Sequence, residues 1–103
     1  MSLSAPESMQ IAKYHFITRI DMTGQAICLA DEINLKNVKA VFLNNYGSDN
    51  GTIYLSHKAE NINTEGLTIE ADSKHSFEIA DLNQVYVQGT NGKKLEVQIL
   101  YHG

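Results

Sequence analysis

The sequence predicts an all-β fold: a single antiparallel β-sandwich of about eight strands, jelly-roll-like, preceded by an extended N-terminal arm. Between residues 40 and 103, apolar runs of strand length recur, and stretches rich in Asn, Asp, Gly and Ser separate them. This spacing is typical of sandwiches and barrels. In the last run, residues 94–101, apolar side chains alternate with polar ones, as they do in a strand with one buried face. About eight such strands suit a jelly roll or a small sandwich.

The length and composition indicate one domain. A chain of 103 residues with 43% hydrophobic content can build one core, and its size is near that of the commonest single domains. We expect residues 1–10, which hold several serines and the one proline, to form the arm, and residues 11–103 to form the sandwich. Cys28 is the one cysteine, so no internal disulfide can form and folding needs no oxidising compartment.

The charge balance and hydropathy exclude several classes of partner. A net charge of -4 argues against binding to nucleic acid, which usually requires a basic face. No stretch approaches the ~20 apolar residues of a membrane span. The first ten residues lack the basic segment and apolar run of a signal peptide. We therefore expect no nucleic-acid partner, no membrane partner, and synthesis and assembly in a cytoplasm.

The first third of the chain is expected to add two strands. In residues 10–20, Tyr14, Phe16 and Ile20 fall on one side of an extended chain, and the other side is polar except for Ile17, which interrupts the alternation. This pattern predicts a half-buried strand. A turn at Thr23-Gly24 should lead to a short strand over residues 25–30. Residues 31–39 fit a β-edge or one helical turn, and we favour an extended connection.

The rest of the chain suggests three hairpins. Asn50-Gly51 supplies the positive φ angles of a tight hairpin turn, and similar turn residues follow at 71–74 and 89–92. The expected strand pairs are residues 41–45 with 52–56, 67–70 with 75–79, and 85–88 with 94–101. Asp81 is expected to cap one helical turn. Asn50-Gly51-Thr52 also matches a glycosylation sequon, which we expect to be unused.

No metal, cofactor or catalytic motif emerges. The four histidines are scattered and lack the ligand spacing of a zinc site. When Gly51 is aligned with the invariant glycine of an EF-hand, Tyr46 and His57 occupy ligand positions, so calcium is not expected. Asp72, Ser73, His75 and Ser76 have the residue types of a hydrolytic triad, but adjacency in sequence is no evidence for one. We expect no cofactor, and we interpret Cys28 as a small, partly buried side chain.

Three tyrosines leave a sugar-binding alternative open. Tyr46, Tyr54 and Tyr86 could present rings to a carbohydrate. Tyr54 and Tyr86 also suit the face of a sheet, where they would need no ligand.

The runs of the last two thirds resemble those of a known group of proteins. They are VFLNN (41–45), GTIYLS (51–56), GLTI (66–69), DLNQVYVQG (81–89) and LEVQI (95–99). Together they resemble small β-sandwich virion proteins of tailed bacteriophages, which include capsid decoration proteins and modules of head fibres or tails. Ser56 stands where that group commonly has glycine, and Ala71-Asp72-Ser73 replaces its Pro-Gly turn. Residues 1–39 lie outside the resemblance.

The resemblance implies a non-enzymatic structural virion protein, most simply a capsid decoration protein that stabilises a shell through many weak contacts. Its partners would be other virion proteins, such as the major capsid protein or fibre and tail proteins, and further copies of itself. The predicted contact residues are Leu3, Pro6, Met9 and Ile11 in and beside the arm, and Tyr46 at a loop tip. The alternative is a carbohydrate- or receptor-binding module of a fibre or tail appendage.

Overall fold

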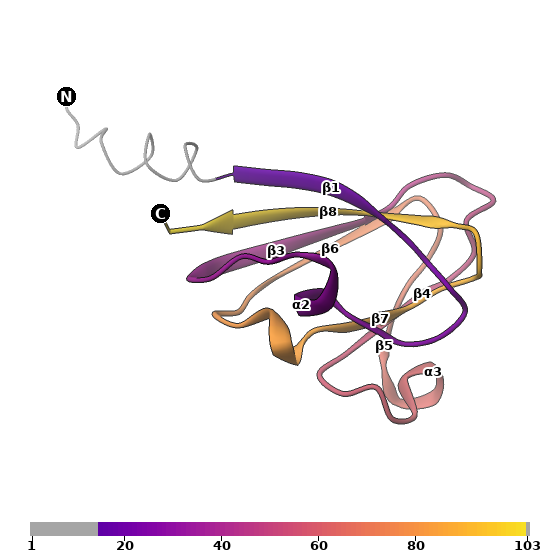
Figure 1. Cartoon of the computed structure of the whole chain (residues 1–103). Coiled ribbons are helices and arrows are strands. Elements are labelled where there is room, and N and C mark those ends of the chain that lie inside the picture. The colour runs from indigo at the N-terminus through magenta and orange to yellow at the C-terminus, as the bar shows by residue number, and fades with distance from the viewer. Residues whose placement is uncertain (1–14, 103) are drawn as a thin grey trace.

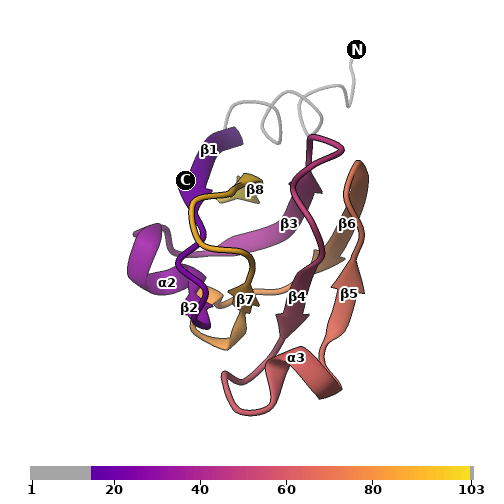
Figure 2. The same ribbon diagram turned by 90° about the vertical axis from the view of Figure 1, so that its right-hand side faces the viewer.

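A computed structural model describes residues 15–102 of the chain. Eight antiparallel strands form two four-stranded sheets that face each other (Figures 1 and 2). The first sheet contains, in spatial order, β1 (His15–Asp21), β8 (Lys94–Tyr101), β3 (Val38–Asn45) and β6 (Ser73–Glu78). The second contains β2 (Ile27–Cys28), β7 (Tyr86–Gln88), β4 (Ile53–Ser56) and β5 (Leu67–Ile69). The predicted all-β sandwich is confirmed.

The strand order is that of a jelly roll. β1 pairs with β8, β2 with β7, β3 with β6 and β4 with β5, so the first four strands run beside the last four like one long hairpin rolled up. The pairing continues through a connection between the sheets: the Met22 N–H donates to the Lys93 carbonyl at 2.7 Å, and the Gly24 N–H donates to the Gly89 carbonyl at 3.1 Å.

All three expected hairpins are wrong in their pairing. The strands β3 and β4, β5 and β6, and β7 and β8 follow one another in sequence, yet each pair is divided between the two sheets. The turn residues lie where predicted, and Gly51 has a positive φ of 73°. Each turn carries the chain across the sandwich instead of folding it back within one sheet. Among the strands that the structure describes, β4 and β5 are the one consecutive pair that are neighbours in a sheet.

The core lies between the two sheets. The predicted inward residues of β8 are Leu95, Val97, Ile99 and Tyr101; the first three are completely buried, and Tyr101 is partly buried against the core. Val41 and Leu43 of β3 are completely buried beside them. Each of these apolar side chains contributes roughly 1.5–3 kcal/mol when removed from water. The interlocked side chains make the sandwich a rigid platform for whatever its outer faces carry.

Three short helical turns complete the fold of residues 15–102. The 3₁₀ turn η1 (Leu82–Gln84) is capped as predicted, because an Asp81 carboxylate oxygen accepts the Asn83 N–H at 2.9 Å. The helix α2 (Leu29–Glu32) replaces the end of the strand expected over residues 25–30 and the start of the expected extended connection. Buried Leu29 holds this turn against the core. The helix α3 (Ile62–Glu65) lies between β4 and β5.

Two asparagines form a buried amide cluster at one end of the sandwich. Asn45 is completely buried, and its Nδ2 donates to the carbonyls of Gly51 at 2.7 Å and Ile69 at 2.9 Å. The Asn50 Nδ2 donates to the Asn45 Oδ1 at 2.6 Å and to the Lys94 carbonyl at 2.8 Å. These bonds tie β3, β5 and β8 together. Asn50 is only 7% exposed, so its sequon is closed to glycosylation in the folded chain.

Candidate interaction surface

The outer face of the first sheet, called here the first-sheet face, combines exposed apolar side chains with charged ones. The register places Gln98 of β8 between Ile17 of β1 and Phe42 of β3. Ile17 is 57% exposed and Phe42 is 37% exposed. Large apolar side chains that remain in water on one sheet face are typical of an interaction site.

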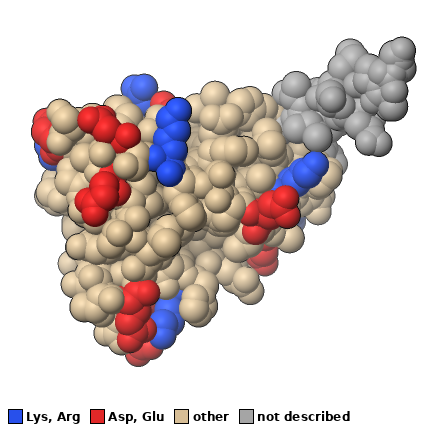
Figure 3. Space-filling view, turned by 180° about the vertical axis from the view of Figure 1, so that it is seen from behind, with Lys and Arg blue, Asp and Glu red and all other residues tan. Residues whose placement is uncertain are grey.

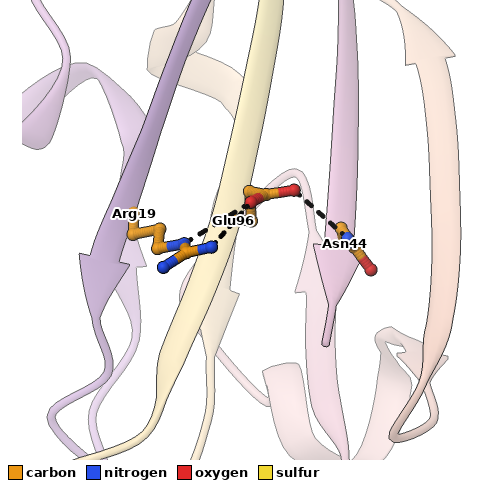
Figure 4. Close-up of polar contacts among 3 residues, drawn as sticks. All are labelled: Arg19, Asn44 and Glu96. Atoms are coloured by element: carbon orange, nitrogen blue, oxygen red, sulfur yellow. Dashed lines mark hydrogen bonds and ion pairs between the residues drawn. The ribbon is translucent and has the colours of Figure 1, made fainter. Parts of the chain in front are cut away.

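A polar row lies beside these apolar residues. Arg19, Glu96 and Asn44 come from the neighbouring strands β1, β8 and β3 and point toward one another (Figure 4). Arg19 Nε and Nη2 each donate to Glu96 Oε2 at 3.4 Å, and Asn44 Nδ2 donates to Glu96 Oε1 at 3.2 Å. The Arg19 side chain is 59% exposed, so the ion pair adds little to stability. It does fix the orientation of three side chains on the surface.

Tyr46 lies at the border of this face. It follows the end of β3 and is half-buried, and the Arg19 guanidinium carbon lies 4.7 Å from the centre of its ring. A cation at this distance from an aromatic ring is attracted to the π-system. The ring is therefore held by β1 instead of projecting freely from a loop tip. The other predicted contact residues, Leu3, Pro6, Met9 and Ile11, lie outside the described residues.

A second ion pair continues the polar border. Lys94 of β8 pairs with Asp21 of β1. The hydrogen bond with Asp21 raises the pKa of the Lys94 ammonium, and the negative charge of Asp21 raises it further. Both groups are more than half exposed, so water screens this attraction strongly. The polar border is thus internally balanced in charge.

The second sheet carries its own surface feature. Tyr54 of β4 lies opposite Gln88 of β7, and Tyr86 lies opposite Ser56, so the two tyrosines are diagonal neighbours in the register. A shallow hollow of about 430 Å³ is lined by Gly24, Thr52, Tyr54, Gln88, Gly89 and Thr90. Tyr46 follows β3 of the other sheet, so the three tyrosines do not form a single platform.

Tyr86 and Cys28 are cross-strand neighbours on this sheet. The electrostatic effect of Cys28 raises the pKa of the Tyr86 hydroxyl, and burial, a hydrogen bond with Cys28 and the charge of Asp31 raise it further. The Cys28 thiol lies 3.6 Å from the Leu82 carbonyl oxygen and 3.5 Å from that of Asn83. Cys28 is partly buried, as predicted.

The residues that have the types of a hydrolytic triad make structural contacts instead. Asp72 Oδ1 accepts the N–H of Gly47 at 2.9 Å, which links the β5–β6 connection to the β3–β4 connection. The His75 ring lies 5.9 Å from the Phe77 ring along β6. Among residues 15–102, no hydrogen bond joins Asp72, Ser73 and His75.

Charges and metal ligands are dispersed over the described chain. On the face shown in Figure 3, acidic and basic side chains form small separate groups around a wide uncharged area. Within residues 15–102, no three His, Cys, Asp or Glu side chains gather as a metal site requires. In the same range no helix is long and apolar enough to cross a membrane.

Sequence reasoning missed the first-sheet face. Ile17 interrupts the alternation expected of β1, and that interruption was the available signal. No such signal in the sequence marks Phe42, because its outward position follows from the pairing of β3 with β8. The link between Ile17 and Phe42 depends on two strand registers that the sequence does not reveal.

No protein-family model and no curated protein matches the chain. Among solved structures, it is similar to a protein of Bacillus endospore appendages, described as a family of disulfide-linked pili, with a TM-score of 0.53 and 14% identity over 85% of this chain and 84% of that one. A looser likeness, with a TM-score of 0.41 and 7% identity, covers 87% of this chain and 88% of the tobacco streak virus coat protein. At 14% identity, the likeness to the appendage protein supports the fold alone. The likeness to the coat protein is too weak to support any inference.

Proposed function

We propose that the chain is a non-enzymatic structural subunit of a larger particle and acts by binding alone. The first-sheet face carries this proposal, because it presents Ile17 and Phe42 to solvent beside a fixed row of polar groups on a rigid sandwich. Such a face is suited to burial against another protein. The similar protein comes from endospore appendages that are described as disulfide-linked pili, which is in keeping with this role.

The particle that best fits the sequence pattern is the virion of a tailed bacteriophage, in which the chain would be a capsid decoration protein. Its partners would be the major capsid protein, or fibre and tail proteins, and other copies of the chain. Leu3, Pro6, Met9 and Ile11 would contact a neighbouring subunit or the shell, and Tyr46 would contribute at the border of the first-sheet face. Many such contacts across a lattice would hold the chain more tightly than any one interface.

Co-sedimentation tests the proposed role. The purified full chain is mixed with phage shells that lack it and centrifuged through a sucrose cushion. We expect the chain to pellet with the shells and to raise the temperature at which they break open. A Leu3→Asp/Met9→Asp variant should remain largely in the supernatant. A chain that stays monomeric at high concentration and does not pellet would contradict the role.

A carbohydrate-binding function is the second candidate, and the hollow beside Tyr54 favours it. There an aromatic ring lies with two threonines and the Gln88 amide, and sugars bind through ring stacking combined with such polar groups. A glycan array probed with the labelled chain tests this function. A hit that Tyr54→Ala abolishes and Tyr46→Ala retains would support it, whereas an array without hits would exclude it.

A further inference from the structure

The two sheets differ in the length of their edge strands. In the second sheet the edges are β2, with two residues, and β5, with three. In the first sheet they are β1, with seven residues, and β6, with six (Figure 2). Short edge strands, prolines, bulges and inward-pointing charges are the usual protections against pairing with another chain.

The edges of the first sheet have none of these protections. Neither β1 nor β6 contains a proline, and the residues on their inner sides are uncharged or histidine. Their registers with β8 and β3 are continuous. Within residues 15–102, β1 pairs with β8 alone and β6 pairs with β3 alone, so each strand leaves one backbone edge open to a further strand.

The backbones of these two open edges are complementary. Each neighbouring pair in the first sheet is antiparallel, so β1 and β6 run in opposite directions. A second copy that is shifted sideways, without being turned over, therefore places its β1 antiparallel to β6 of the first copy. Antiparallel strands form the stronger of the two kinds of ladder.

The N–H groups on the two open edges also match. The N–H of Met22, just after β1, donates toward β8, and the N–H of Ile79, just after β6, donates toward β3. Because successive N–H groups point to opposite sides of a strand, odd-numbered residues of β1 and even-numbered residues of β6 direct theirs to the open edges. The same residues carry the exposed side chains of the two strands. Directly opposed residues place their side chains on one face, so the two edges can join with both faces of the sheet continuous.

We infer that β1 of one copy pairs with β6 of the next, so that their first sheets join into one antiparallel sheet; this deepens the proposed function and rests on it. Two different edges meet, so the contact is heterologous, and each added copy leaves one edge for a further copy. The twist between neighbouring strands rotates each copy relative to the last. Repetition of the contact therefore gives a ring or a helical row.

The charges on the edges select the register of this contact. Arg19 and Lys74 lie in the same row across the sheet, so copies joined without a stagger would place these two cations opposite each other. A stagger of two residues places Asp21 opposite Lys74 and Arg19 opposite Ser76. Asp21 then lies between Lys74 of the neighbouring copy and Lys94 of its own chain. The opposed residues in this register exchange about six backbone hydrogen bonds.

An apolar hollow beside β6 supports the same register. Its volume is about 200 Å³, and its lining includes Phe77, Ile79, Leu55 and Val85. Phe77 and Ile79 are only partly buried against the core. The staggered register places Phe16 of the neighbouring copy opposite Ile79, on the inner side of the sheet. The ring of Phe16 thus covers the rim of the hollow and extends the core beyond β6, which adds apolar burial to the backbone hydrogen bonds.

Prolines on the two edges test the contact. Ser76→Pro and Ile17→Pro each remove an N–H that points to an open edge, a position where a strand tolerates proline. In sedimentation velocity, the wild-type full chain should form oligomers larger than a dimer. Each variant alone should be monomeric at the same concentration, with a dissociation constant raised at least about 10-fold. An equimolar mixture should form a 1:1 dimer and nothing larger, because one variant keeps its β1 edge and the other keeps its β6 edge.

The matched controls are Ser76→Ala and Ile17→Ala, which retain the N–H groups and should still form the larger oligomers. Circular dichroism verifies folding. If a proline variant does not fold, Thr18→Lys decides, because it keeps each N–H and places an inward-pointing charge on the β1 edge; it should be monomeric.

Three results would overturn the inference: a monomeric wild-type chain, a folded edge variant that still forms the larger oligomers, or a mixture of the two proline variants that stays monomeric. The shell experiment separates this failure from that of the proposed function. A wild-type chain that is monomeric and still pellets with shells would refute the edge contact and leave the structural role standing.

Discussion

Two consecutive asparagines in β3 show how position decides what a residue contributes. Asn45 points into the sandwich and is completely buried, whereas Asn44 is half-buried and donates to Glu96 on the first-sheet face. Composition alone suggests an amide-rich surface. In the structure, Asn45 and Asn50 are interior groups whose hydrogen bonds hold the strand ends together.

Removing the buried amide should be costly. Asn45→Ala removes the side-chain partner of the Gly51 and Ile69 carbonyls and one of the two acceptors of the Asn50 amide, and should lower the free energy of unfolding by about 3 kcal/mol. Asn44→Ala, the matched control on the other side of the strand, should lower it by less than about 1 kcal/mol. Urea denaturation followed by circular dichroism measures both values. Equal losses would mean that the buried cluster does not stabilise the sandwich.

The ionisation of Tyr86 should report on Cys28. Replacing Cys28 with alanine removes the largest cause of the raised pKa of Tyr86, so this pKa should fall toward its ordinary value. Asp31→Asn should have a smaller effect, because Asp31 contributes least. Since the folded chain holds this proton more tightly than the unfolded chain, the contribution of Tyr86 to stability declines as the pH rises above about 10. NMR titration of the ring measures the pKa, and an unchanged value in Cys28→Ala would refute the assignment.

At the scale of elements, the α3 turn is fitted closely to the strand before it. The Gly66 N–H donates to the Ile62 carbonyl at 3.0 Å. A Cβ atom at Gly66 would lie 2.5 Å from the Ile62 oxygen and 2.9 Å from the Leu55 oxygen. Both oxygens belong to the backbone and cannot rotate away, so the junction between α3 and β5 requires glycine.

Gly66→Ala should therefore lower the free energy of unfolding by about 2 kcal/mol, because the backbone must shift to relieve the overlap. Glu65→Ala is the neighbouring control. It removes only the exposed ion pair with Lys58 and should cost less than about 0.5 kcal/mol. Thermal unfolding measures the stability of both variants. A Gly66→Ala chain as stable as wild type would contradict the packing described for this junction.

At the scale of the whole molecule, the rolled hairpin makes nearly every pairing distant in sequence. β1 pairs with β8 from His15 opposite Leu100 to Asp21 opposite Lys94. Such contacts form only after a long loop has closed, and the entropy of closure slows folding.

We expect refolding from urea to take milliseconds to seconds. Stopped-flow tyrosine fluorescence at a low chain concentration measures the rate without contributions from association. Refolding in microseconds would indicate that local hairpins form first. It would contradict the pairing of the first four strands with the last four.

The same topology explains what the sequence could and could not predict. Alternation identifies the buried residues of β8, and the Asp81 cap follows from local chemistry. Alternation does not say which strand lies alongside, because hairpins and sheet-to-sheet turns use the same Asn, Asp and Gly residues. The pairing of Ile17 and Phe42 across Gln98, and the burial of Asn45, depend on that missing information.

The number of copies in purified particles tests the central claim, that this sandwich is a structural subunit, most directly. Quantitative mass spectrometry of purified virions gives the ratio of this chain to the major capsid protein. We expect a fixed ratio that is the same in every preparation and survives washing at high salt, because apolar contacts are not screened by salt. A chain that is absent from the particles, or whose ratio falls toward zero with washing, would contradict the account.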